Sequence, residues 1–231
     1  MHVRSNKCII TFIGPVGVGK STQIGLLKNS LKSRRSRVVE SYIKSTHGLA
    51  YILSKFLIVL SGSEKTTFPD GNTQLYPRKE LMKRLFTLWR FLDAFSIITK
   101  FFFTVYLPFC LGFTTLVEEG LMMTIFTYRR SFPVLFQLES KSPPVIPVLL
   151  GWVMSKHNVN FVFDATDDEL EQRRRKREFR RSELSMYVTL QRRWMKRLND
   201  DNTFFVDTTG KTADQVHRNI VIALDTHKSA L

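Results

Sequence analysis

The sequence has few cysteines and few acidic residues. Cys8 and Cys110 are its two cysteines, and each lies in an apolar run without the closely spaced partners of a zinc or redox site. This argues against a disulfide scaffold and favours two reduced, buried thiols in a cytoplasmic protein. The chain has 20 acidic residues against 35 Lys and Arg, a net charge of +15. We therefore expect anionic partners, among them nucleotides, nucleic acid or an acidic membrane surface.

Long hydrophobic segments are also scarce. The apolar stretch 8–13 is too short for a secretory signal. The stretch 101–117 has no charge over 17 residues, but this is the lower limit for crossing a bilayer and Pro108 and Gly112 interrupt it. A buried helix end, a turn at Leu107-Pro108 and a buried strand explain it better. With 231 residues, 43% of them hydrophobic, we expect a single domain over 1–231.

Short apolar segments alternate with segments of helical spacing along the chain. Such alternation predicts an α/β fold, a five-stranded parallel sheet with helices on both faces. The expected strands are 7–13, 37–42, 113–117, 160–164 and 203–207. The expected helices are 19–32, 49–60, 79–103, 146–156, 167–177, 183–198 and 212–224, and the polar stretch 61–78 is expected to be a loop, with an insertion at about 61–80.

A phosphate-binding motif follows the first expected strand. The run Gly14-Pro15-Val16-Gly17-Val18-Gly19-Lys20-Ser21 matches G-x-x-x-x-G-K-[ST] and opens a helix. Its glycines let backbone N–H groups point at phosphate oxygens. The N-terminus of the following helix contributes the positive end of the helix dipole. We expect ATP or GTP to contact this run and Thr22. Lys20, facing solvent without nucleotide, would reach the β- and γ-phosphates, and the Ser21 hydroxyl would hold Mg²⁺. These features predict a P-loop NTPase fold.

A basic run forms the predicted lid of this site, residues about 173–183. Seven of the nine residues from 173 to 181 are Lys or Arg. Arg173 and Arg177 lie four residues apart and so share one helix face, and Arg174 lies beside them at a spacing of three from Arg177. We expect them to close over the ATP phosphates and act in catalysis. A solvated helix end remains the alternative, because basic residues suit the helix dipole there.

Three segments resemble the thymidylate kinase family. They are Gly-Lys-Ser-Thr-Gln at 19–23, the apolar segment 107–120 that ends in Val-Glu-Glu-Gly, and the succession 161–209, with its arginine-rich segment and final Phe-Val-Asp-Thr-Thr. The resemblance extends over nearly the whole chain, although only the phosphate loop is sharply specific. It implies a nucleoside monophosphate kinase with a mobile lid, which transfers the γ-phosphoryl group of ATP to dTMP or a related acceptor. It also implies Mg²⁺ as cofactor and a homodimer.

The same resemblance assigns further site residues. The acid after the third strand belongs to the magnesium shell, and strand alternation favours Glu118 over Glu119 for this position. Arg90 resembles the family's acceptor-contacting arginine, while Lys44 and His47 follow the second strand, where the acceptor would lie. The family's next residue is an arginine that grips the acceptor phosphate, but here Glu119-Gly120 follows the acid.

Two alternatives remain open from the sequence. A deoxynucleoside kinase would use a carboxylate at the end of a strand as base toward a sugar hydroxyl, and Glu40 could serve. A degenerate ATP-binding protein would dock on nucleic acid or on an acidic membrane through the basic run. The arginine-rich segment 173–181 argues against the first alternative, because it carries more charge than an uncharged acceptor demands. The missing arginine after Glu118 and the apolar stretch 101–117 support the second.

Overall fold

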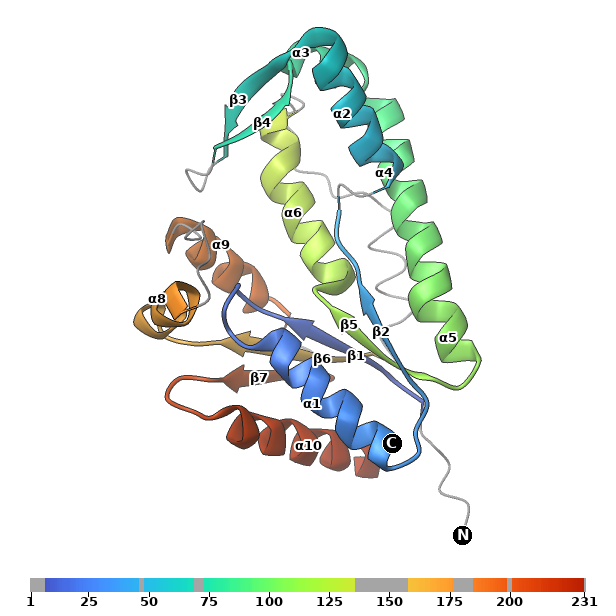
Figure 1. Ribbon diagram of the computed structural model, residues 1–231, viewed down its shortest axis with the longest axis vertical. Helices are drawn as coiled ribbons and strands as arrows, with labels where there is room; N and C mark the ends of the chain where they lie inside the picture. Colours follow the sequence, from blue (N-terminus) through green and yellow to red (C-terminus); the bar gives the residue numbers. More distant parts are fainter. Residues whose placement is uncertain are drawn as a thin grey trace.

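The computed structural model describes residues 7–45, 48–68, 73–135, 158–176, 185–198 and 201–230. Its centre is a five-stranded sheet in the order β2-β5-β1-β6-β7 (Figure 1). Every neighbouring pair in this sheet is parallel. The predicted α/β fold class and all five predicted strands are therefore confirmed. The strands are β1 (Ile9–Ile13), β2 (Val38–Tyr42), β5 (Thr114–Glu118), β6 (Asn158–Asp164) and β7 (Thr203–Asp207).

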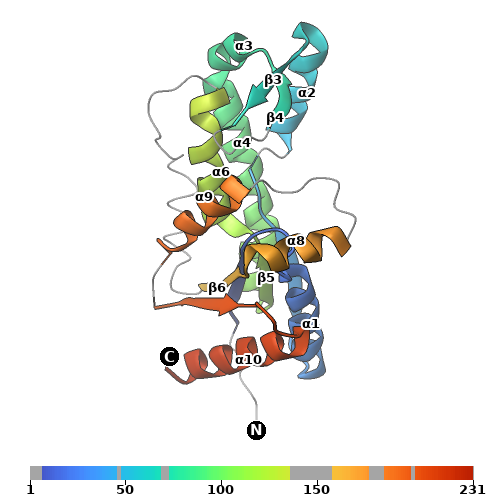
Figure 2. The same ribbon diagram turned by 90° about the vertical axis from the view of Figure 1, so that its left-hand side faces the viewer.

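Helices cover both faces of this sheet (Figures 1 and 2). On one face α1 (Lys20–Ser33) and α10 (Ala213–Ala230) bury their apolar sides against Phe12 and Phe161. On the other face lie α4 (Phe86–Phe101), α6 (Gly120–Leu135) and α9 (Ser185–Met195), which pack on residues such as Ile13 and Val117. β1 is buried along its whole length because it has neighbours in every direction.

The polar stretch 61–78, predicted to be a loop, instead contains a β-hairpin. Strand β3 (Ser63–Thr67) pairs antiparallel with β4 (Thr73–Pro77), next to α2 (Leu49–Ser61). Thr66 and Phe68 are buried and anchor the hairpin, and threonine suits the pleated backbone of a strand. The loop prediction was wrong because it rested on the polar composition of the stretch. The hairpin lies inside the range expected to be an insertion, and the single-domain assignment stays a prediction.

Helix boundaries differ from the prediction at several places. The predicted helix 79–103 is divided into α3 (Lys79–Arg84) and α4, and Leu85 lies between them. The helix α6 was not predicted, since Gly120 opens it and its β-branched residues lower helix propensity. The other predicted helices correspond to α1, α2, α8 (Asp167–Lys176), α9 and α10. The predicted helix 146–156 lies outside the described residues.

The predicted turn at Leu107-Pro108 is also wrong, because the helix continues through it. After α4 comes a π-helical turn (η1, Phe102–Tyr106) and then α5 (Leu107–Cys110). Pro108 lacks an N–H group and its ring would clash with the carbonyl of Thr104 in an α-helix, so a wider turn relieves the clash. The chain turns at Leu111 and Gly112 instead, before β5 begins.

The continuous helical segment Phe86–Cys110 is long and apolar enough to cross a membrane, judged by length and composition. However, Trp89, Ile97 and Val105 on its inner side belong to the hydrophobic core against the sheet. It therefore packs as a helix of this α/β fold. Cys110 at its end is exposed, contrary to the expectation of a buried thiol, and neither cysteine forms a disulfide.

Candidate active site

The phosphate loop joins β1 to α1 and lies against β6 and α8. Gly14 has φ 153°, and a Cβ atom there would come within 2.5 Å of the Phe163 carbonyl oxygen. Gly17 has φ 91°, and its Cβ would contact the Arg174 side chain at 3.3 Å. Both positions therefore need glycine for the loop to fit between its neighbours. The packing fixes the loop at the carboxyl end of the central strand, where α/β sheets bind ligands.

The Lys20 side chain lies inside this loop rather than in solvent. Its ammonium donates hydrogen bonds to the carbonyl oxygens of Gly14, at 2.7 Å, and of Pro15, at 3.1 Å. Only 6% of the residue is exposed. The expectation of a solvent-facing lysine was wrong, because the backbone carbonyls of the loop give the ammonium group local acceptors. The charge is thus already held in the loop where phosphate would bind.

Ser21 and Glu118 come together although 97 positions separate them in the chain. The Ser21 hydroxyl lies 3.2 and 3.4 Å from the two carboxylate oxygens of Glu118. Hydroxyl and carboxylate oxygens are the hard ligands that Mg²⁺ prefers, and Mg²⁺ usually takes only one or two carboxylates from a protein. The described residues contain no cluster of three or more His, Cys, Asp or Glu that could hold a metal. The Ser21–Glu118 pair therefore fits Mg²⁺ that is also held by nucleotide phosphates.

Glu119, the residue after Glu118, turns away from Ser21. It has φ 69° and its N–H donates to the Phe12 carbonyl oxygen. The Tyr42 hydroxyl lies 3.5 Å from its carboxylate. Burial, and then the charge of Glu119, raise the pKa of Tyr42. Gly120 follows because a Cβ there would lie 2.7 Å from the Thr11 methyl group. The strained backbone at Glu119 thus sends the two adjacent carboxylates to different partners.

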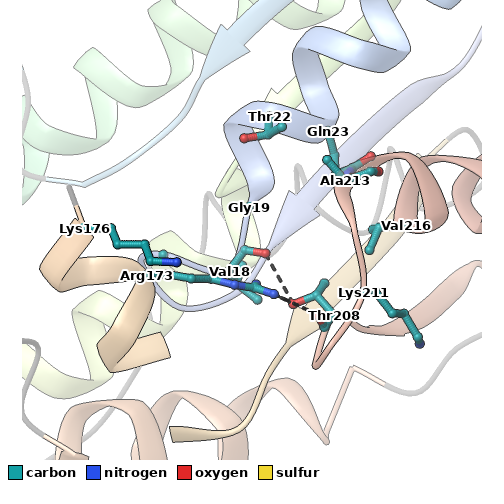
Figure 3. Close-up of a pocket in the computed structure, with 11 residues that line it drawn as sticks. Val18, Gly19, Thr22, Gln23, Arg173, Lys176, Thr208, Lys211, Ala213 and Val216 are labelled. Atoms are coloured by element: carbon teal, nitrogen blue, oxygen red, sulfur yellow. Dashed lines mark hydrogen bonds between the residues drawn. The ribbon is translucent and has the colours of Figure 1, made fainter. Parts of the chain in front are cut away.

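Two of the predicted lid arginines, on α8, contact the loops that follow β1 and β7. Arg173 donates to the Thr208 hydroxyl at 3.0 Å and to the Thr208 carbonyl at 2.8 Å (Figure 3). Arg174 is only 6% exposed, and its Nε donates to the Val16 carbonyl of the phosphate loop at 3.2 Å. These contacts attach α8 to the loop after β7 and to the phosphate loop. Arg177 lies outside the described residues.

A pocket of about 250 Å³ opens beside the phosphate loop. Figure 3 shows side chains from α1, α8 and the segment after β7 around it. Thr22 was predicted here, but Lys176, Thr208 and Lys211 were not named as site residues. The Asp-Thr-Thr sequence at the end of β7 was the available signal, because it ends a strand at the ligand-binding edge of the sheet. The pocket combines apolar walls, such as Val216, with cations, which suits a nucleotide.

Glu169 connects the lid helix to the same pocket. Its carboxylate accepts the Gly210 N–H at 3.0 Å and pairs with Arg173 at 2.8 Å. The Gly210 hydrogen bond, and then the Arg173 hydrogen bond, hold the pKa of Glu169 below its usual value. Glu169 therefore stays ionised at neutral pH and fixes the direction of the Arg173 guanidinium group.

The predicted acceptor residues lie on two elements that meet. Lys44 is exposed just after β2, and farther along this connection the Leu49 N–H donates to the Ser96 hydroxyl of α4 at 3.1 Å. Arg90 lies six residues before Ser96 on α4, about 9 Å along the helix axis. Its guanidinium carbon is 6.0 Å from the centre of the Phe86 ring. His47 lies outside the described residues, so its place in the site stays a prediction.

Glu40, the base of the alternative nucleoside kinase, does not lie at the end of its strand. It pairs with Leu116 in the middle of β2, and its carboxylate forms a salt bridge of 3.0 Å with Lys28 of α1. Lys28 is eight residues beyond Lys20, about 12 Å along α1 from the phosphate loop. This finding removes the residue on which the alternative was based.

The fold and the phosphate loop define a P-loop NTPase architecture. No protein-family model and no curated protein matches the sequence. In structure the chain is similar to the thymidylate kinase of Candida albicans, with a TM-score of 0.54 at 17% identity over 96% of this chain and 92% of that chain. It is also similar to the thymidylate kinase of Ehrlichia chaffeensis, with a TM-score of 0.50 at 15% identity over 94% and 98% of the two chains. The chain thus has the thymidylate kinase fold.

Proposed function

We propose that the chain is an ATP-dependent nucleoside monophosphate kinase whose acceptor is dTMP or a close relative. The observation that carries this proposal is the convergence of Lys20, Ser21 and Glu118 at the carboxyl ends of β1 and β5. The thymidylate kinase fold of the chain supports it. Phosphoryl transfer requires positioning and charge stabilisation more than covalent chemistry from the protein, and these residues supply both.

In the proposed reaction an oxygen of the acceptor phosphate attacks the γ-phosphorus of ATP. The bond from the γ-phosphorus to the β,γ-bridging oxygen breaks, so the products are ADP and a nucleoside diphosphate. The backbone N–H groups of the phosphate loop hold the phosphates, and Lys20 exchanges its contacts with the Gly14 and Pro15 carbonyls for the β- and γ-phosphates. Arg173 and Arg174 stabilise the charge that develops during transfer.

Ser21 and Glu118 would hold Mg²⁺ in this site. When bound, the ion neutralises charge on the β- and γ-phosphate oxygens. The arrangement of Glu118 supports this role, because its carboxylate already lies beside the Ser21 hydroxyl. Glu119 does not share the position, since its backbone turns its side chain toward Tyr42.

The acceptor would lie between the segment after β2 and helix α4. Arg90 is positioned by the Phe86 ring below it, and Lys44 extends from the neighbouring segment. The family's phosphate-gripping arginine is replaced by Glu119, so Lys44, Arg90 and His47 are the residues we assign to acceptor binding. Without the family's arginine, fewer cations hold the acceptor phosphate. We therefore expect the KM for the acceptor to be higher than the KM for ATP.

We also propose a homodimer, with the outer face of α2 as its interface. Ile52, Phe56 and Val59 are 61, 57 and 83% exposed and lie on one face at helical spacing. An apolar stripe of this kind is typical of a protein interface. Sedimentation velocity of wild type and Phe56→Ser would test it, and a monomeric wild-type chain would contradict it.

The central experiment is a coupled assay of ADP formation with ATP, Mg²⁺ and a panel of acceptors. The panel contains the common nucleoside monophosphates and, separately, thymidine. We expect turnover with dTMP or one other monophosphate and none with thymidine. Turnover with thymidine alone would favour a nucleoside kinase. ATP binding without turnover on any acceptor would instead favour a degenerate ATP-binding protein.

A further inference from the structure

An exposed aromatic cluster lies on the π-helical turn η1, far along the chain from the phosphate loop. Phe102, Phe103 and Tyr106 are 44, 60 and 40% exposed, and their rings contact one another with centroid distances of 5.2 and 5.8 Å. Leu111, just beyond α5, is 57% exposed. We call these four residues the η1 patch. Large apolar side chains gathered on a surface usually mark a contact with another molecule.

The rings of the patch lie on the side of the helix opposite its buried residues. In the η1 turn the hydrogen bonds join residues five apart, and Phe101, Val105 and Phe109, spaced four apart, lie in the core. The three aromatic residues of the patch then lie on the outer side. Since no catalytic step proposed above uses this surface, its exposure calls for another explanation.

Two cations lie near α5 and the turn at Gly112, next to Leu111 of the η1 patch. The Lys7 ammonium lies 5.0 Å from the Phe109 ring centre, and the Arg37 guanidinium lies 4.9 Å from that of Phe113. Both cationic residues are exposed. Lys100, two residues before Phe102, instead lies over the Tyr42 ring, whose hydroxyl is beside Glu119. Figure 1 places α5 and the connection from α1 to β2, which carries Arg37, at the same end of the molecule.

Acidic residues are missing from both segments that form this end. No Asp or Glu occurs in 7–39 or in 94–117. Two acids from other positions already contact cations: Glu40 pairs with Lys28, and Asp225 lies 4.0 Å from Arg34. The end of the molecule that carries the η1 patch is therefore cationic as well as aromatic. Anionic lipid headgroups attract such a surface, and aromatic rings favour the boundary between headgroups and acyl chains.

We propose that the η1 patch docks the protein on the surface of an anionic membrane. Phe102, Phe103 and Tyr106 enter the boundary region, while Lys7 and Arg37 contact headgroup phosphates. The inference does not depend on kinase activity, because it uses none of the active-site residues. It also differs from docking through the basic run, whose described residues 173–176 lie on α8, beside the phosphate loop. A second copy of the chain would not use the cations. A single-stranded nucleic acid would use the cations and stack its bases on flat ring faces, but Phe102 and Phe103 pack edge to face at 88°, and the patch also contains the aliphatic Leu111. This arrangement favours insertion into a lipid surface.

The test is co-sedimentation of the full chain with vesicles. One set is pure phosphatidylcholine and the other contains roughly one-third phosphatidylglycerol. We expect binding to the anionic vesicles alone, weakened by added salt because headgroup contacts are screened. Phe103→Ser should lower the affinity by on the order of tenfold, since it removes an inserted ring. The double variant Lys7→Glu/Arg37→Glu should lower it at least as much.

Matched controls come from the β3–β4 hairpin. Leu75→Ser removes a side chain that is 61% exposed, and Lys65→Glu reverses an exposed charge. Both should bind vesicles like wild type, and thermal melting should show all variants folded. Absence of binding to anionic vesicles, or equal losses for Phe103→Ser and Leu75→Ser, would overturn the proposal. So would a dimer that Phe103→Ser dissociates, or single-stranded DNA that binds through the same four residues more tightly than vesicles do.

Discussion

The Lys20 ammonium donates a hydrogen bond of 2.7 Å to the Gly14 carbonyl oxygen, and these two residues stand near opposite ends of the phosphate loop. Because Lys20 supports the loop as well as facing its concave side, Lys20→Ala should have two effects. Turnover should fall below about a tenth of wild type, since the charge that stabilises transfer is lost. The free energy of unfolding without nucleotide should fall by about 1–2 kcal/mol, because two hydrogen bonds are lost. Steady-state kinetics and urea unfolding measure the two.

Lys28→Ala is the matched control for this prediction. It removes the same side chain from the same helix, and its salt bridge with Glu40 lies outside the site. Turnover should stay near wild type and stability should change by less than about 1 kcal/mol. If Lys20→Ala and Lys28→Ala behave alike in kinetics, the loop is not the catalytic cradle.

Glu118 and Glu119 should differ in their effect on magnesium dependence. In Glu118→Gln the carboxylate beside Ser21 becomes an amide, so the Mg²⁺ concentration for half-maximal rate should rise by on the order of tenfold. In Glu119→Gln the altered side chain faces Tyr42, so this concentration should stay within about twofold of wild type. Initial rates at fixed ATP over a magnesium series decide between them. A shift for Glu119→Gln alone would reverse the assignment.

The lid arginines should lose kcat more than ATP affinity when truncated. Arg173→Ala and Arg174→Ala each remove a guanidinium group at the nucleotide side, and at least one should lower kcat by about 10²-fold or more. Arg175→Ala is the control, since Arg175 is 79% exposed and pairs with Glu171 on the outer side of α8. Uniform small losses at all three positions would indicate a solvated helix end. The same series should be extended to Arg177.

The sheet and the phosphate loop could be predicted because local sequence determines them. A buried β-branched strand before a glycine-rich loop has few structural alternatives, so β1 and α1 were found from the residues alone. The hairpin β3–β4 could not, since its stability comes from cross-strand pairing and from Phe68 beneath it. Pairing of this kind depends on tertiary contacts rather than on composition.

Long-range contacts also limit what sequence reveals about the site. The motif identified Ser21, and strand alternation favoured Glu118, but their separation of 3.2 Å depends on β5 pairing beside β1. The contact of Arg174 with the Val16 carbonyl spans 158 positions and has no local signature. Helix spacing grouped Arg173 with Arg174 through their distances from Arg177, and their role at the phosphates stays a prediction. It could not show that one contacts Thr208 and the other the phosphate loop.

Asp93 and Tyr128 form a buried hydrogen-bonded pair that no sequence pattern indicated. The Tyr128 hydroxyl donates to the Asp93 carboxylate and joins α6 to α4, and Asp93 is fully buried. Burial, and then the charge of Asp93, raise the pKa of Tyr128, so it remains a donor at neutral pH. Arg90 follows Trp89 on the same helix, one turn before Asp93, so this pair also supports the proposed acceptor side.

Tyr128→Phe should therefore lower the free energy of unfolding by about 1–3 kcal/mol, because it removes a donor from a buried carboxylate. Tyr51→Phe removes the same hydroxyl group from a residue that is 50% exposed and should change stability by less than about 0.5 kcal/mol. Urea unfolding of the two variants measures the difference. If the pair also positions Arg90, Tyr128→Phe will raise the acceptor KM several-fold while the KM for ATP stays constant. Equal stability of the two variants would show that the Asp93 carboxylate does not depend on Tyr128.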